Sequence, residues 1–77
     1  MPVFPLDLSS TPYAVRIDQV DSNTSYIGKA EPGSGEAAGV WQIQRITVSG
    51  TITSIEWAGG TDEFDKVWDD RVGLTYS

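Results

Sequence analysis

The stretch VWQIQRITVSGTITSIEW, residues 40–57, restricts the fold of this chain more than any other part of the sequence. Residues 40–48 alternate between two faces, and residues 51–57 are rich in β-branched side chains, which strands favour. Ser49-Gly50 between them is typical of a tight turn. The pattern therefore predicts a β-hairpin. The side chains expected on its buried face are Trp41, Ile43, Ile55 and Trp57.

Two shorter strands are predicted before this hairpin. Residues 13–18 alternate apolar and polar side chains, which indicates a half-buried strand with Tyr13, Val15 and Ile17 on one face. Residues 26–30 form the second strand, and Gly28 inside it marks a bulge or a close approach to the backbone.

The segments that join these strands are rich in turn residues. Asp21-Ser22-Asn23 is typical of a turn. Residues 31–39 are mostly small and lack periodicity, so they predict a flexible connector. In an assembly the same loop could instead lie against another chain, because small residues let backbones approach closely.

After the hairpin, residues 58–61 break the strand and the periodicity changes. Phe64, Val67 and Trp68 follow helical spacing, and Asp62 could cap the start while Asp65 suits the first turn. We expect a short helical turn near residues 62–70, followed by a last strand over residues 72–76. The predicted fold is mainly β: a small antiparallel sheet or barrel-like domain of four or five short strands over residues 13–77.

Residues 1–12 predict an extended N-terminal arm. Pro2, Pro5 and Pro12 remove backbone donors and favour extended neighbours. The arm also carries apolar side chains suited to binding a partner: Val3, Phe4, Leu6 and Leu8. It could lie across its own domain or on a neighbouring subunit.

The residue inventory excludes several function classes. The 77 residues contain no cysteine and no histidine, which leaves no disulfide, no thiolate metal site and no Cys- or His-based nucleophilic catalysis. The net charge of −6 disfavours nucleic acid and anionic membranes, and no apolar run is long enough to span a bilayer. A domain this small has a marginal core, and partner subunits are the stabilising device that remains.

The segment FDKVWDDR, residues 64–71, combines large apolar side chains with charges. The surrounding carboxylates lack the spacing and the turn glycine of a calcium loop. A glycosidase pair would need a cleft that a chain of this length hardly provides. We therefore expect a structural clasp formed by Phe64, Trp68, Asp69 and Arg71, with Arg71 paired to Asp69 or to an acid elsewhere. No catalytic, cofactor-binding or metal-binding residue is expected.

Three tryptophans, Trp41, Trp57 and Trp68, are many for so short a chain. Aromatic side chains of this size usually fill cores, and they are also common at interfaces. A third use is a platform on which a sugar stacks.

The order YIGKA, VWQIQRI, IEWAGG, FDKVWDDR, LTYS over residues 26–77 resembles short structural proteins of tailed bacteriophages. The resemblance implies a non-enzymatic virion protein without a cofactor, most simply one that decorates or cements the capsid. Its partners would then be other phage structural proteins, the major capsid protein first, and copies of itself, with neither nucleic acid nor membrane. A tail, neck or fibre-anchoring accessory protein is the alternative, and a small carbohydrate-binding module is a third.

Overall fold

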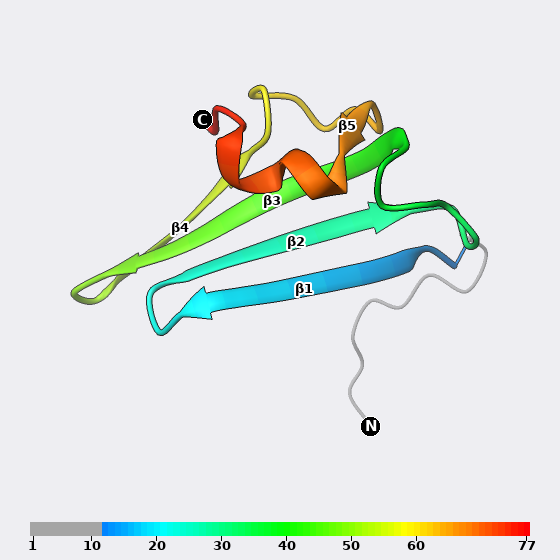
Figure 1. The fold of residues 1–77 in the computed structure, drawn as a ribbon. Helices are drawn as coiled ribbons and strands as arrows, with labels where there is room; N and C mark the ends of the chain where they lie inside the picture. The colour runs from blue at the N-terminus through cyan, green and yellow to red at the C-terminus, as the bar shows by residue number, and fades with distance from the viewer. Residues whose placement is uncertain (1–11) are drawn as a thin grey trace.

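The computed structural model describes residues 12–77, which form one antiparallel sheet with a short 3-10 helix on one side (Figure 1). The strands follow the chain in the order β1-β2-β3-β4, and β5 pairs with β3. The mainly β fold with four or five antiparallel strands is thus confirmed, although the sheet does not close into a barrel. The elements are β1 (Ala14–Asp21), β2 (Thr24–Ala30), β3 (Gly39–Ser49), β4 (Ile52–Trp57), β5 (Lys66–Val67) and the helix η1 (Trp68–Gly73).

Tight turns join the strands where the sequence predicts them. The β3–β4 hairpin turns at Gly50, whose φ of 61° is a conformation that glycine adopts without strain. Between β1 and β2, the Asp21 carboxylate accepts a hydrogen bond from the Asn23 amide at 2.7 Å. The arm predicted over residues 1–12 lies outside the described residues, apart from Pro12.

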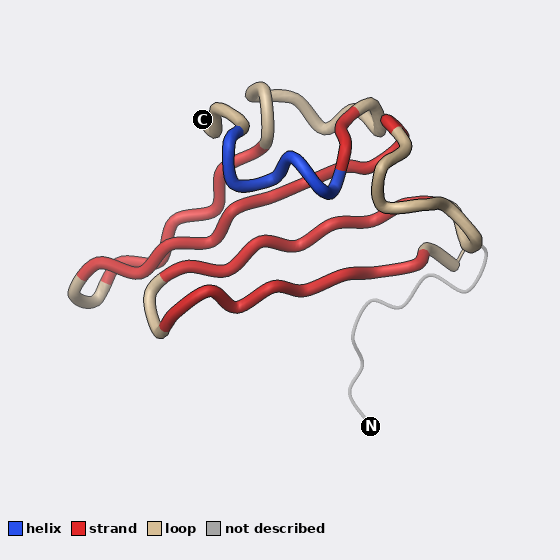
Figure 2. Tube along the Cα trace, viewed as in Figure 1, coloured by secondary structure: helices blue, strands red, loops and turns tan. Residues whose placement is uncertain are grey.

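The two faces of the sheet differ in what covers them. On one face, called the covered face, the helix η1 and the C-terminal residues pack over the strands, and η1 crosses in front of β3 (Figure 2). The core lies here and consists of Tyr26, Ala30, Trp41, Ile43, Ala58, Trp68 and Tyr76. The opposite face, called the open face, carries Val15, Ile17, Ile27, Ile46, Val48 and Ile55 by the strand register.

The expected facing of β1 is wrong. Val15 and Ile17 are 48% and 68% exposed, whereas Ala14, Arg16 and Asp18 turn toward the covered face. The rings of Trp41 and Trp68 explain why the apolar side chains of β1 turn away. These rings occupy the space above the covered face, so β1 can place there only small side chains or long ones that extend beyond the rings.

The expected buried face of the β3–β4 hairpin is half right. Trp41 and Ile43 are almost fully buried on the covered face. Ile55 pairs with Ile46 and Trp57 with Gln44, so both lie on the open face, and Ile55 is 56% exposed. Both faces of this hairpin carry apolar side chains, and periodicity alone does not say which face is covered.

The helix expected near residues 62–70 starts later in the chain. Lys66–Val67 form β5 instead, pairing with the part of β3 that β4 does not reach. The helix then runs over Trp68–Gly73, and Val67 precedes it without a side-chain cap, so Asp62 is not the cap. The last strand reduces to one bridge between Ala58 and Tyr76.

Candidate functional site

The covered face is closed by a pair of tryptophans that lie against a glycine. The Trp41 and Trp68 ring centroids are 5.9 Å apart. A Cβ atom at Gly28 would lie only 2.5 Å from Cε3 of Trp68 and 3.1 Å from Cε3 of Trp41. The close approach that the sequence predicts at Gly28 is therefore an approach by two indole rings.

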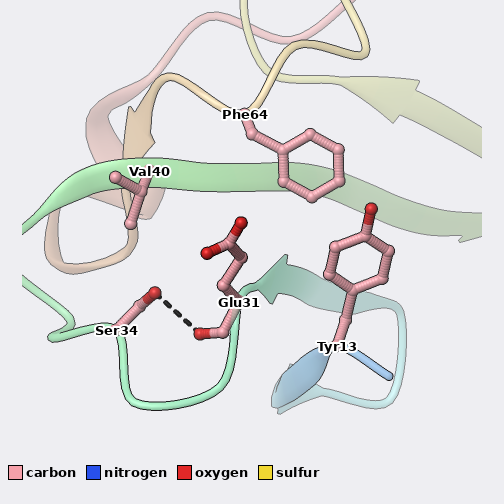
Figure 3. Close-up of a pocket in the computed structure, with 5 residues that line it drawn as sticks. All are labelled: Tyr13, Glu31, Ser34, Val40 and Phe64. Carbon is pink, nitrogen blue, oxygen red and sulfur yellow. Dashed lines mark hydrogen bonds between the residues drawn. The ribbon is translucent and has the colours of Figure 1, made fainter. Parts of the chain in front are cut away.

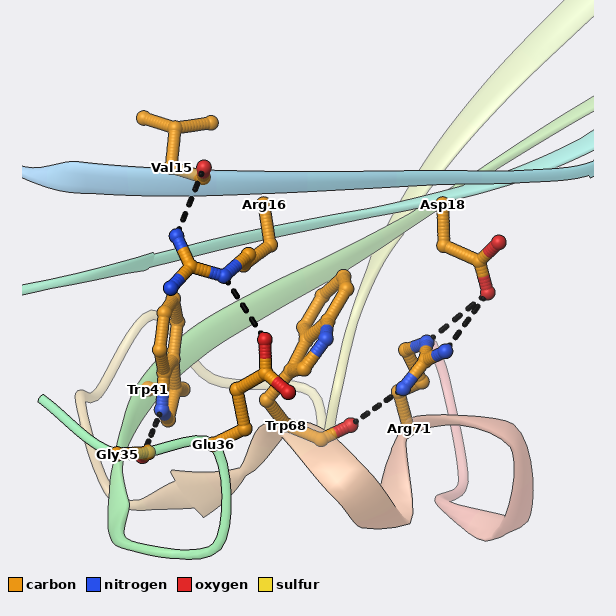
Figure 4. A network of polar contacts seen from close by, with 8 residues as sticks. All are labelled: Val15, Arg16, Asp18, Gly35, Glu36, Trp41, Trp68 and Arg71. Carbon is orange, nitrogen blue, oxygen red and sulfur yellow. Dashed lines mark hydrogen bonds and ion pairs between the residues drawn. The ribbon is translucent and has the colours of Figure 1, made fainter.

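Two arginines lie over these rings and reach acids on other elements (Figure 4). Arg71 lies 4.5 Å above the Trp68 ring, and its Nε and Nη2 both lie 3.0 Å from Oδ2 of Asp18. Arg16 lies 5.5 Å from the Trp41 ring and pairs with Glu36 at 2.9 Å. Because these pairs are partly exposed, each contributes about 0–1 kcal/mol, with a similar amount from the cation–π contact.

The loop between β2 and β3 is held by its own chain. The indole Nε1 of Trp41 donates to the Gly35 carbonyl at 2.9 Å, and the Asp69 amide donates to the Glu36 carbonyl at 3.1 Å. The loop therefore contacts both the sheet and η1. The flexible connector expected over residues 31–39 is in this respect wrong.

A second polar cluster surrounds Tyr76 near the C-terminus. The Tyr76 hydroxyl donates to the Arg71 carbonyl at 2.7 Å, and the Arg45 guanidinium lies 4.8 Å from its ring. Burial raises the pKa of Tyr76 to about 12, the nearby Tyr26 adds to the rise, and Arg45 and Arg71 oppose it. Arg45 in turn pairs with Glu56 at 2.6 Å, while its buried Nε has no partner among the described residues.

The four residues of the predicted clasp are not all brought together. Trp68 is buried, and Arg71 binds Asp18, an acid elsewhere in the sequence, not Asp69. Asp69 is exposed. Phe64 is 38% exposed and lies away from Trp68, stacked on Tyr13 at 5.1 Å between ring centroids.

Phe64 and Tyr13 line a hollow of about 400 Å³ together with Glu31, Ser34 and Val40 (Figure 3). The Ser34 hydroxyl already donates to the Glu31 carbonyl at 2.7 Å. One carboxylate beside two aromatic rings does not make a recognisable reaction centre.

Residues 12–77 contain no group of three or more acidic side chains placed to hold a metal ion. They also form no helix long and apolar enough to cross a bilayer.

The open face is the feature that sequence reasoning missed. The register sets Ile17 beside Ile27 and Ile46 beside Ile55, with Ser25 and Gln44 between the two pairs, so this face is rich in apolar side chains across four strands. Lys29 is the one charged residue whose register position falls on this face, within the described strands. The signal was present in residues 40–57, whose apolar side chains occupy both faces of the hairpin.

Comparison with known proteins adds no relative to this description. The chain matches no family model, no curated protein and no solved structure. The candidate functional site therefore rests on the geometry of this chain alone.

Proposed function

We propose that this chain is a non-enzymatic structural protein of a tailed-bacteriophage virion, where it decorates or cements the capsid. Its partners in this proposal are the major capsid protein and further copies of the chain. The observation that carries the proposal is the open face, an apolar surface on one side of a small sheet.

The charge distribution supports a binding role for this face. The chain has 11 acidic residues and a net charge of −6, yet no acid within the described strands has a register position on the open face. Large contiguous apolar patches on soluble domains usually mark interaction sites. A face that carries isoleucine and valine beside uncharged polar side chains suits a protein partner.

The bacteriophage resemblance supports the same proposal through the fold. All seven buried apolar residues fall within the five motifs that carry the resemblance. Tyr26 and Ala30 lie in YIGKA, Trp68 lies in FDKVWDDR, and Tyr76 lies in LTYS. The motifs therefore supply this core, and the resemblance that they carry implies no catalytic residue.

The alternatives differ in measurable ways. A tail, neck or fibre-anchoring protein would be present in a few copies per particle, because those structures have low rotational symmetry, whereas a capsid protein is present in hundreds. A sugar-binding module needs exposed rings, and Trp41 and Trp68 are buried. Only Trp57 remains partly exposed for that use.

Two measurements test the proposal. Quantitative mass spectrometry of purified particles gives the copy number, and absence of the chain from the particle would overturn the proposal. Co-sedimentation with particles that lack the chain then tests the open face. We expect Ile55→Asp to abolish binding, whereas Val72→Asp, an equally drastic change at a residue that is 69% exposed on η1, should bind normally.

A further inference from the structure

We propose that the free edge of β4, the side that faces away from β3, pairs in antiparallel fashion with the same edge of a second copy of this chain. The inference deepens the proposed function and rests on it, because it names the surface through which two copies meet. The strand order leaves β1 and β4 at the two edges of the sheet (Figure 1). The last residues of the chain cover only one end of the β4 edge.

The backbone of β4 alternates between groups that bond to β3 and groups that point away from the sheet. Trp57 shows which residues point away, because its amide donates to the Ser77 carbonyl at 3.0 Å and its carbonyl accepts from the Ser77 amide at 3.1 Å. By the same alternation, the groups of Thr53 and Ile55 also point away. No backbone group within residues 12–77 bonds to them on this side. Each of the two residues therefore offers one donor and one acceptor to a further strand.

The two edge strands differ in the features that prevent such pairing. Natural edge strands are protected by charges, by proline and by β-bulges. β1 carries Arg16, Asp18 and Asp21, and its register with β2 shifts before the last of these. Residues 47–55, which include most of β4, contain neither a charge nor a proline. Their register with β3 is regular, and the side chains of residues 52–55 are all exposed. The β4 edge is therefore the one suited to pairing.

Residues 1–11 of the same molecule are too short to supply the added strand. Ile55 is level with Gln19 in the register, so the place beside it lies about 23 Å along the strands from Pro12 and about 19 Å across them. The straight distance of about 30 Å takes about nine residues, even when they are fully extended. Of this segment only residues 1–3 would remain to pair, and Pro2 among them lacks a donor. The limit depends on length alone.

A second copy fits the edge because the strand is complementary to itself. With Thr53 opposite Thr53 of the second copy, Ile55 lies opposite Thr51, and β-branched side chains meet across the pair. A register centred on Ser54 would place Thr51 of the second copy where Ser77 lies. The register centred on Thr53 is therefore the longest that leaves room for the end of the chain.

This register also keeps the charges of the two copies apart. The net charge of −6 opposes contact wherever acids of two copies come close. Glu56, the acid of β4, would lie opposite Gly50 of the second copy and six positions from its own counterpart. Six positions are about 20 Å, which exceeds the screening length of about 8 Å. A twofold axis through the paired strands and normal to the sheet also sets both open faces on the same side, where they join into one surface.

A disulfide trap tests the pairing, because the sequence contains no cysteine. Full-length Thr53→Cys is oxidised gently, and the disulfide-linked dimer is followed over time by non-reducing electrophoresis. The proposed pairing sets the two Cα atoms about 5.5 Å apart, a distance that a disulfide spans. We expect the dimer to form about tenfold faster than in either of two control variants, because pairing holds the thiols at about millimolar effective concentration, against about 0.1 mM of protein in solution.

The controls are Gln19→Cys and Val72→Cys. Gln19 lies on the open face like Thr53, but on the other edge strand, and Val72 is 69% exposed on η1. Adding Ile55→Lys to Thr53→Cys should remove the faster rate, since natural edge strands use lysine against pairing. Ile55 is 56% exposed, so this change leaves the core intact, and urea titration of the variant verifies that it is folded.

Equal rates for Thr53→Cys and Gln19→Cys would overturn the inference. A faster rate that Ile55→Lys leaves intact would overturn it too, because the disulfide would then not depend on the β4 edge. Purified protein suffices, so the result is separate from the virion experiments. A chain that is present in particles without the faster rate would keep the proposed function and lose this inference. A chain with the faster rate that is absent from particles would keep the pairing and lose the proposed function.

Discussion

Replacing Gly28 by alanine should destabilise this protein, although alanine is usually the better residue away from turns. The added methyl group would lie 2.5 Å from Cε3 and 2.7 Å from Cζ3 of the buried Trp68. The indole cannot retreat easily, because Trp41 lies behind it at 5.9 Å between centroids and Arg71 covers its other side. Overpacking of this kind costs about 1–3 kcal/mol.

That cost is a large part of the stability of so small a domain, which at 0.05–0.15 kcal/mol per residue is about 4–12 kcal/mol. Urea titration of the wild type and of Gly28→Ala measures the difference. Each kcal/mol should also lower the Tm by roughly 4–8 °C.

The matched control is Gly73→Ala, because nothing lies within 4 Å of a Cβ at Gly73 and its φ is not positive. We expect the control to be neutral or slightly stabilising, since alanine loses less entropy on folding. A double variant with Trp68→Leu should recover at least about 0.5 kcal/mol relative to the sum of the single effects, because it removes the clashing ring. Equal stability of Gly28→Ala and Gly73→Ala would refute the packing argument.

Three further predictions test the clasp and the C-terminal cluster. Trp68→Ala should cost about 3–5 kcal/mol because it leaves a cavity in the core. Phe64→Ala should cost less, about 1–3 kcal/mol, because its ring is 38% exposed and loses partial burial and the stacking on Tyr13. Chemical denaturation that ranked the two the other way would contradict the structure. Asp69→Asn should change the free energy of unfolding by less than about 0.5 kcal/mol, since the side chain is exposed. A larger loss of stability in chemical denaturation would contradict the exposed position of Asp69. The pKa of Tyr76 is raised from 10.0 to about 12, so the neutral phenol favours the folded state. The contribution of Tyr76 to the free energy of unfolding is therefore fully present below pH 10 and falls by on the order of 2 kcal/mol between pH 10 and 12. Tyr76→Phe should reduce this decline when unfolding is followed at several pH values.

The sequence predicted the hairpins better than it predicted what covers them. The β3–β4 hairpin and its turn at Gly50 are confirmed because β-branched residues and turn chemistry act over a few neighbours. The strand before it was also found where expected. The face of β1 that turns toward the core was predicted wrongly, because Val15 and Ile17 give β1 an apolar face that the fold leaves exposed.

The failure on β1 has a physical cause that lies far away in the sequence. Trp68 packs over Gly28, and Arg71 draws Asp18 toward the covered face across 53 residues of sequence. Periodicity within one strand carries no information on such partners. The open face, which carries the proposed function, was hidden for the same reason.

The helix near residues 62–70 was misplaced because the backbone of Lys66–Val67 can join either a helical turn or the sheet. Lys66–Val67 pair with β3, and this removes the first turn that the spacing of Phe64, Val67 and Trp68 predicted. Tertiary pairing overrides a helical pattern of so few residues, since a single turn has little stability of its own. Arg71 could be predicted to pair with an acid, but the identity of that acid, Asp18, could not.

Residues 68–76 cover one face of the sheet, and this affects the order in which the chain folds. Consecutive hairpins build the four-stranded meander, and such local pairing forms quickly. Yet Trp68 and Tyr76, two of the seven core side chains, come from the last ten residues. During synthesis a nascent chain that ends before Trp68 therefore exposes both faces of its sheet. We expect cooperative folding only after residues 68–76 have left the ribosome, so that a chain cut before Trp68 would be prone to aggregation.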